Sequence, residues 1–226
     1  MSVSSGSGFA VSNDGYLVTN NHVIEGCQQV FVYRRGKKYK TDVVAYDTRN
    51  DLALLKGAFR PDVNLPLSSA KPYLAQDLYV SGYPFGMNVS SSEKVTKGII
   101  SSFTSIGNNL VEMQIDAALQ SGNSGGPTLD EYGNVVGVAV AKLDVKFALE
   151  KFVAIPENTN FGVKANIVEA LLDASGVVYQ QGKGEKPSEA EFSNMVSKGT
   201  YYISCWMTPA QIEAMKTKKV IFSDLQ

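Results

Sequence analysis

The stretch that decides the fold reads LVTNNHVI and spans residues 17–24. It joins a short run rich in strand-forming residues to His22, the only histidine in a chain of 226 residues. Because valine and threonine favour extended structure, the stretch predicts a strand that ends just before the imidazole. A histidine in that position is a candidate general base, since the imidazole pKa lies near neutrality.

Two further stretches contain the other groups that acyl-transfer chemistry needs. NDLALL, residues 50–55, places Asp51 before an apolar run, and SGNSGGP, residues 121–127, places Ser124 among glycines. A serine hydroxyl needs a base to remove its proton, and a carboxylate orients that base and stabilises its protonated form. The chain order His, Asp, Ser differs from that of α/β-hydrolases. The three stretches together predict a catalytic triad of His22, Asp51 and Ser124.

The glycines beside the serine have a predicted role of their own. Gly122 can adopt backbone angles that are closed to other residues, so its N–H and that of Ser124 can point to one place. Two such donors form an oxyanion hole, which stabilises the charge that develops during attack. We therefore expect the oxyanion hole at Gly122, Asn123 and Ser124.

Short strand patterns separated by polar or glycine-rich turns recur through the first 165 residues. This spacing is typical of an all-β sandwich or a pair of barrels. A polar, proline-bearing stretch at 60–73 is interpreted as the connection between two substructures. The predicted strands are 9–11, 16–19, 30–33, 41–46, 52–55, 78–81, 95–103, 110–115 and 135–141.

The C-terminal part has a different pattern. Apolar residues at 167–172 have helical spacing, and Gly176 is well placed as the C-terminal cap of a helix. Residues 183–191 are polar and predict a loop, whereas 200–206 predict a strand. Thr208 to Gln211 resemble a capping box that opens a short helix.

Composition narrows the function classes. The hydrophobic share is 44%, the charged share is 19% and the net charge is −1, which argues against nucleic acid as the main partner because a basic surface would be needed. No run of 18 apolar residues predicts a membrane span. The N-terminus has no apolar signal region, so we expect either that the protein stays inside the cell or that a signal segment has been removed.

Cys27 and Cys205 are the only cysteines and lie far apart in the sequence. Two thiols cannot make a four-ligand zinc site when the only histidine is needed elsewhere, so we expect neither a metal nor a cofactor. The two residues either form one long-range disulfide or are both reduced.

The motifs of this chain resemble those of trypsin-like serine proteases, in particular the HtrA-like bacterial branch. The resemblance implies an all-β, chymotrypsin-type fold of two six-stranded antiparallel barrels, and hydrolysis of peptide bonds through an acyl-enzyme. It implies that His22 is the general base, Asp51 the orienting acid and Ser124 the nucleophile. The motifs are GSGF (6–9), DGYLVTNNHV (14–23), NDLALL (50–55) and GNSGGP (122–127), supported by GYPFG (82–86), VTKGII (95–100) and QIDAA (114–118).

The resemblance also implies a division of the chain. We expect a first barrel at 1–72, a second barrel at 73–165, and a C-terminal helix with a short tail at 166–226. The tail is too short for the PDZ domain that many HtrA-like proteins carry. One hypothesis docks the strand 200–206 on the first barrel, fixed by a bond between its cysteine and Cys27; the alternative packs the tail loosely on the second barrel.

The resemblance places the substrate pocket near Ala118, Leu119 and Phe161. No acid occupies the position where a trypsin-like pocket has its acidic floor, so a basic substrate side chain would enter an uncompensated apolar site. We therefore expect cleavage after small or aliphatic residues. Asp116 would suggest a basic preference instead, but its position matches a structural aspartate of the HtrA-like branch.

Three functions remain to be compared. The first is an active endopeptidase that acts on polypeptides, the second a binding or chaperone module with latent or no turnover, and the third an esterase with the same triad. The resemblance favours a periplasmic or secreted protein, although a cytoplasmic location stays open. The oligomeric state is also left open.

Overall fold

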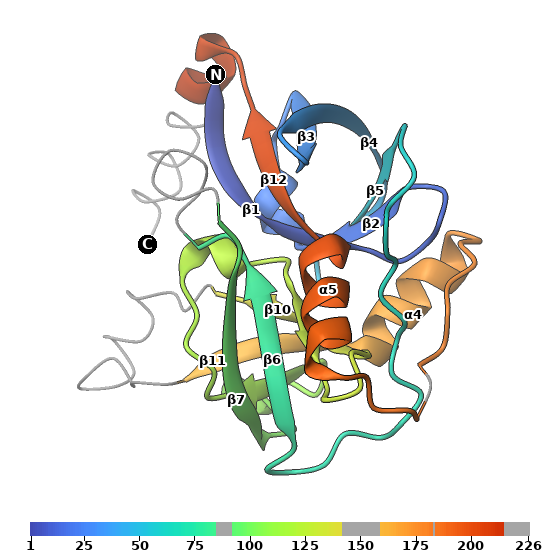
Figure 1. Cartoon of the computed structure of the whole chain (residues 1–226). Helices are drawn as coiled ribbons and strands as arrows, with labels where there is room; N and C mark the ends of the chain where they lie inside the picture. Colours follow the sequence, from blue (N-terminus) through green and yellow to red (C-terminus); the bar gives the residue numbers. More distant parts are fainter. Residues whose placement is uncertain (85–91, 142–158, 183, 215–226) are drawn as a thin grey trace.

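Two closed antiparallel barrels make up most of the molecule (Figure 1). The structure is a computed structural model and describes residues 1–84, 92–141, 159–182 and 184–214. The all-β prediction of two six-stranded barrels is confirmed. Within the described residues, the first barrel has the strand order β1-β12-β3-β4-β5-β2 and the second has β10-β11-β8-β7-β6-β9.

Most strands match a predicted stretch to within a few residues, but the first begins at Ser2, and those at 127–129 and 160–164 were not predicted. In the first barrel they are β1 (Ser2–Ala10), β2 (Tyr16–Thr19), β3 (Gln29–Arg34), β4 (Lys37–Asp47), β5 (Leu52–Gly57) and β12 (Thr200–Trp206). In the second they are β6 (Asp77–Gly82), β7 (Lys94–Ser102), β8 (Glu112–Ile115), β9 (Pro127–Leu129), β10 (Val135–Val140) and β11 (Asn160–Lys164). The helices are α1 (Asn21–Ile24), α4 (Ala165–Ala174) and α5 (Glu189–Gly199), with short 3-10 turns η1 (Ile106–Asn108) and η2 (Ser121–Asn123).

The barrels share a continuous apolar core. Phe9 and Leu54 from the first barrel belong to the same buried cluster as Leu129 and Val138 from the second. Burial of such side chains is the main favourable contribution to folding. The shared core therefore fixes the two barrels against each other, which holds the residues between them in place.

The C-terminal strand β12 completes the first barrel. It pairs antiparallel with β1, where Gly6 lies opposite Ile203, and with β3, where Cys205 lies opposite Val30. A disulfide joins Cys27 to Cys205. Without β12, two strands would each expose an unpaired edge. The expected extension 166–226 therefore includes an integral strand of the first barrel, as the docking hypothesis stated, and the loosely packed tail is wrong for residues 200–206.

Helices α4 and α5 pack on the barrels. In α4, Val168 and Leu172 are buried in the shared core, and Gly176 follows with a φ of +66°, as the predicted cap requires. The loop expected at 183–191 is wrong for its last three residues, because α5 begins at Glu189. Its cap, in which Ser188 and Glu191 bond each other's backbone N–H groups, stabilises the helix start.

The last described residues confirm another local prediction. The Thr208 hydroxyl accepts from the Gln211 N–H at 3.3 Å, while the Gln211 side chain accepts from the Thr208 N–H at 2.9 Å. Residues 209–214 are helical. The expected continuation of this helix to Lys218 lies outside the described residues.

Candidate active site

His22 lies on α1, a single helical turn directly after β2. The backbone before it is tied to the turn that carries Asp51: the Asn20 side chain and the Asn21 N–H both donate to the Asp51 carbonyl oxygen, at 2.9 and 3.2 Å. Because β2 and β5 are neighbours in the barrel, the residues at these strand ends meet without long loops.

Asp51 stands at the end of a tight turn before β5. Its φ of +54° lies in the left-handed region, which few residues other than glycine adopt and which Asp tolerates better than most. Asp47 stabilises the turn, since its carboxylate accepts from the Arg49 and Asn50 N–H groups at 3.0 Å each. Although burial acts to raise it, these N–H groups hold the pKa of Asp47 below its ordinary value. The turn thus aims the Asp51 side chain at α1.

The Asp51 carboxylate contacts His22 twice. One oxygen lies 2.6 Å from the imidazole Nδ1, and the other accepts from the His22 backbone N–H at 2.9 Å. An ionised carboxylate can only accept, so Nδ1 carries the proton of this contact. In the neutral ring, Nε2 is then the nitrogen with a free lone pair, which is the tautomer a general base needs.

Ser124 follows η2 and is 1% exposed. Its carbonyl oxygen accepts from the Ser7 N–H on β1 at 2.8 Å. A Cβ atom on Gly6 would lie 2.9 Å from that carbonyl oxygen and 2.7 Å from the side chain of Val23, the neighbour of His22. The helix of His22 and the loop of Ser124 therefore flank the same point of β1, and the structure brings the three predicted triad residues to one region between the barrels.

The Ser124 hydroxyl is not bonded to His22 in this conformation. Instead, its oxygen accepts from the Ala141 N–H at 3.2 Å. Among the described residues, the contact between base and carboxylate is formed, whereas the contact between base and nucleophile is not.

The predicted oxyanion donors are arranged as a closed turn. The Ser124 N–H donates to the Ser121 carbonyl oxygen at 3.3 Å, and the Asn123 N–H donates to that of Gln120 at 2.8 Å. A Cβ on Gly122 would collide with the Tyr83 carbonyl group, so only glycine fits there. The Ser124 amide is therefore engaged within its own loop and does not face a substrate oxygen in this conformation.

The three expected pocket residues have different environments. Ala118 is exposed, Leu119 packs half-buried against the core of the second barrel, and Phe161 on β11 is buried. Asn160, next to Phe161, donates from its side chain to the Ala117 carbonyl oxygen at 2.8 Å, which ties β11 to the segment before Ala118. Residues 142–158, which separate β10 from β11, lie outside the described residues.

Asp116 has a structural role. Its carboxylate accepts from the Ile99 N–H at 2.6 Å, and the Asp116 N–H donates to the Ile99 carbonyl oxygen at 3.3 Å. A side chain held by the neighbouring strand in this way is already engaged, which agrees with the structural interpretation of this residue.

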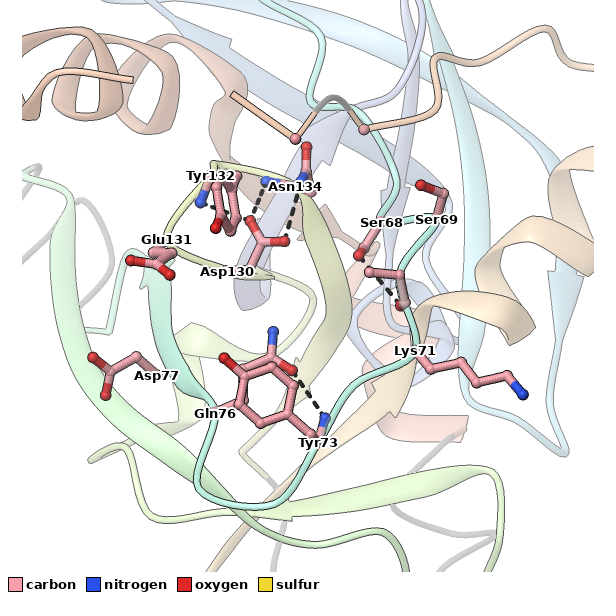
Figure 2. A pocket seen from close by; sticks show the side chains of 13 residues that line it. Ser68, Ser69, Lys71, Tyr73, Gln76, Asp77, Asp130, Glu131, Tyr132 and Asn134 are labelled. Atoms are coloured by element: carbon pink, nitrogen blue, oxygen red, sulfur yellow. Dashed lines mark hydrogen bonds between the residues drawn. The ribbon is translucent and has the colours of Figure 1, made fainter. Parts of the chain in front are cut away.

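A separate cavity of about 270 Å³ lies between the inter-barrel connection and the turn after β9 (Figure 2). None of the predicted triad residues lines it. Its acidic groups are engaged: Asp77 pairs with Lys97, Glu131 with Lys186, and Asp130 accepts from the Asn134 backbone. This cavity is not the candidate active site.

Two residues near the site were missed by sequence reasoning. Ser7 lies within the GSGF motif, and its buried hydroxyl donates to the Gly122 carbonyl oxygen at 2.7 Å and accepts from the Tyr83 N–H at 2.9 Å. The role of Asp47 could have been predicted from the sequence. An Asp at the start of a turn often accepts hydrogen bonds from the backbone N–H groups two or three residues later, which is an Asx turn. Ser7 gave no such local signal, since its partners lie in the other barrel.

Two barrels with a His–Asp pair and a glycine-bounded serine between them define a chymotrypsin-type serine protease fold. The model of the trypsin-like peptidase domain family matches residues 6–138, which is more than half of the chain. The chain belongs to this family.

Relatives of the DegP and HtrA type are similar to this chain. A protein of Bartonella henselae named a probable periplasmic serine endoprotease DegP-like is 40% identical over 96% of this chain and 44% of its own length. An uncharacterized protein of Sinorhizobium fredii, y4bJ, is 36% identical over 89% of this chain and 32% of its own length. The chain thus spans less than half the length of either relative.

Solved structures give the same result. The serine endoprotease from Yersinia pestis aligns with a TM-score of 0.61 and 27% identity, over 75% of this chain and 57% of that one. The HtrA-type protease AlgW with a decapeptide aligns with a TM-score of 0.63 and 30% identity, over 75% of this chain and 51% of that one. In the described part of the chain, no helix has the length and apolarity that a bilayer crossing requires.

Proposed function

We propose that this protein is a serine endopeptidase that cleaves polypeptides through an acyl-enzyme. The observation that carries the proposal is the double contact between Asp51 and His22, which sets both the orientation and the tautomer of the ring. A structural histidine would need only one partner. The carboxylate orients the ring of His22, whose neighbour Val23 lies at the same point of β1 as the carbonyl oxygen of Ser124.

The mechanism follows from these positions. As the Ser124 oxygen attacks the substrate carbonyl carbon, its proton moves to Nε2 of His22, and Asp51 stabilises the resulting imidazolium. The same proton is then delivered to the leaving amine as the C–N bond breaks, which leaves the acyl group on Ser124. A water molecule repeats the sequence, with His22 as base, and releases the acid.

Attack requires a change in the loop of Ser124. The Ser121 carbonyl oxygen, which now accepts from the Ser124 N–H, must turn away so that this amide can face the developing oxyanion. An oxyanion donor contributes about 100- to 1,000-fold to turnover, so the closed turn favours a resting enzyme of low activity. The latent, binding-only module therefore remains the second candidate function, and this turn is the observation that favours it.

The inferred substrate preference rests on the described residues, among which no free acid is found near the pocket residues. Asp116 is engaged by Ile99, and Ala118, Leu119 and Phe161 carry no charge. Burying a lysine or arginine there would leave its charge uncompensated. We infer a preference for small or aliphatic residues before the cleaved bond.

The disulfide supports a location outside the cytoplasm. Bonds such as Cys27–Cys205 persist in oxidising compartments and are rare in the reducing cytosol. The relatives named periplasmic point the same way. We therefore place the protein in the periplasm or outside the cell.

Casein hydrolysis by the wild type and by Ser124→Ala tests the proposal. We expect measurable proteolysis by the wild type and its loss in the variant, with unchanged thermal stability. Hydrolysis of a small ester without proteolysis would favour an esterase, and neither activity, with casein still bound, would favour the binding module.

A further inference from the structure

A cavity of about 320 Å³ lies where the two barrels meet the C-terminal segment. Its walls come from the end of β3, from Asp62 in the inter-barrel connection, from Tyr83 after β6, and from the junction where α5 leads into β12. A volume in this range is usual for sites that hold a small ligand. No triad residue lines this cavity, which we call the Tyr201 cavity.

The lining carries an excess of positive charge. Arg34, Arg35 and Lys198 contribute three cations, against the single carboxylate of Asp62. Asp62 bonds Arg34 and lies 3.0 Å from an Arg35 nitrogen. The Arg34 contact, opposed in part by burial, holds the pKa of Asp62 below its ordinary value. One carboxylate is therefore already bound by two guanidinium groups, and positive charge remains for a second.

The cavity also contains a buried hydroxyl whose proton has no acceptor among the described residues. Tyr201 is 2% exposed and no described group meets hydrogen-bond geometry at its oxygen, although the Asp62 backbone N–H lies close enough to lower its pKa in part. Burial raises the pKa of Tyr201 to about 12, so the hydroxyl keeps its proton at neutral pH. Leaving such a donor unpaired is costly, and a ligand acceptor would satisfy it.

The surroundings favour a single negative charge over a double one. The C-terminal end of α5, with Ser197 and Lys198, lines the cavity, and helix C-termini carry partial negative charge. Glu93 lies behind this wall, where its carboxylate accepts from the Ser81 hydroxyl, and burial raises its pKa. A phosphate dianion would be repelled by both features more strongly than a carboxylate.

We propose that the Tyr201 cavity binds a small organic carboxylate. Arg35 and Lys198 supply the charge, the Tyr201 hydroxyl supplies a hydrogen bond, and the rings of Tyr33 and Tyr83 form apolar walls for the rest of the ligand.

The cavity shares Tyr83 with the loop of Ser124. The Tyr83 N–H donates to Ser7 at 2.9 Å, the Ser7 hydroxyl donates to the Gly122 carbonyl oxygen at 2.7 Å, and Gly122 packs against the Tyr83 carbonyl group. A ligand that moves Tyr83 must therefore also move Gly122. This coupling rests on the proposed function, and it makes the carboxylate a regulator of Ser124.

Calorimetric titration of the full chain with benzoate tests the binding site. Benzamide, which has the same shape without the charge, and inorganic phosphate are the comparison ligands. We expect a benzoate Kd of about 1 mM, an ordinary value for so small a ligand, and at least about tenfold weaker binding of benzamide, as expected for loss of charge-assisted bonds.

The variants separate the cavity from the rest of the surface. We expect Lys198→Gln, Arg35→Gln and Tyr201→Phe each to weaken benzoate binding by about five- to tenfold, whereas Arg49→Gln, an exposed arginine outside the cavity, leaves the Kd within about twofold. Equal binding of benzoate and benzamide, tighter binding of phosphate, or an unchanged Kd in Lys198→Gln and Tyr201→Phe would overturn the proposal.

A second measurement addresses the coupling. We expect saturating benzoate to change the rate at which a fluorophosphonate probe labels Ser124 in the wild type, and to have no such effect in Tyr201→Phe. An unchanged rate would overturn the coupling. Benzoate binding needs no turnover, so a protein that binds benzoate without reacting with the probe keeps the site and contradicts the proposed function instead.

Discussion

The Ser7 hydroxyl donates to the backbone carbonyl oxygen of Gly122 at 2.7 Å. Ser7 lies on β1 of the first barrel, and Gly122 lies in the turn that precedes Ser124 in the second. The Ser7 N–H also donates to the Ser124 carbonyl oxygen, at 2.8 Å. A strand that carries no triad residue therefore holds the nucleophile loop by two hydrogen bonds.

Removing the Ser7 hydroxyl is expected to slow turnover. Ser7→Ala leaves the Gly122 carbonyl and the Tyr83 N–H without this partner, at a cost of about 1–3 kcal/mol in unfolding free energy. Small misplacements of catalytic groups can reduce turnover by about 100-fold, so we expect kcat to fall by about 10- to 100-fold and KM to change little. Steady-state kinetics on a peptide substrate measure kcat and KM separately. Ser2→Ala, on the exposed end of β1, is the control. A stability loss with unchanged kcat would mean that Ser7 is structural only.

Loss of the disulfide is expected to destabilise the first barrel. Cys27 and Cys205 are separated by 178 residues, and closing a long loop by a disulfide stabilises a fold by about 2–5 kcal/mol. Urea denaturation should show this loss in Cys205→Ser and in the reduced wild type alike, with no further effect of reductant on the variant. Two free thiols in the native wild type, found by mass spectrometry, would contradict the bond.

Neutralising Glu93 is expected to stabilise the protein near neutral pH. Burial raises the pKa of Glu93 above its ordinary value near 4.5, so the folded state binds this proton more tightly than the unfolded state does. Stability linked to Glu93 is therefore fully present below the unfolded pKa and is lost as pH rises through the folded pKa. Thermal melting of Glu93→Gln should show a higher Tm than the wild type at pH 7 and little difference at pH 4. A lower Tm at pH 7 would show that the ionised group is satisfied by its partners.

The preferred residue before the cleaved bond can be measured directly. We expect a peptide library to be cut faster after Val or Ala than after Arg, because no uncompensated acid is found among the described residues near Ala118. Phe161→Asp places a carboxylate at the proposed wall, and it should shift the preference toward basic residues. Faster cleavage after Arg by the wild type would overturn the assignment.

Local patterns were enough to predict most of the strands. The stretch before His22 and the apolar run after Asp51 are β2 and β5, and the structure joins their ends through the Asp51–His22 contact. The alternation of apolar and polar residues, together with turn residues, predicts strands because these signals depend only on residues that are close in the sequence.

Features that depend on distant partners were harder to predict. The pairing of β12 with β1 joins residues about 200 positions apart, and a strand pattern does not specify its neighbour, so docking stayed one of two hypotheses. Likewise, the sequence positions of the two cysteines do not reveal the distance between them in space. The helix α5 was missed although Ser188 and Glu191 form a capping-box pattern, because the polar residues at its start are also typical of a loop.

The closed turn at Ser124 has a similar origin. Glycines at 122, 125 and 126 permit more than one arrangement of the loop, and the sequence predicted the open arrangement that catalysis needs. The structure has the Ser124 N–H bonded to Ser121 instead. In this arrangement the loop also bonds Ser7 in the other barrel, a partner that local sequence patterns do not reveal.

Mapping the site of fluorophosphonate modification tests the central claim most directly. The claim is that His22, held by Asp51, activates Ser124. Tandem mass spectrometry of the labelled wild type should find one adduct, on Ser124, and His22→Ala should form it at least about 1,000-fold more slowly, as expected when a triad base is removed. An adduct on another residue, or equal labelling in His22→Ala, would contradict the account.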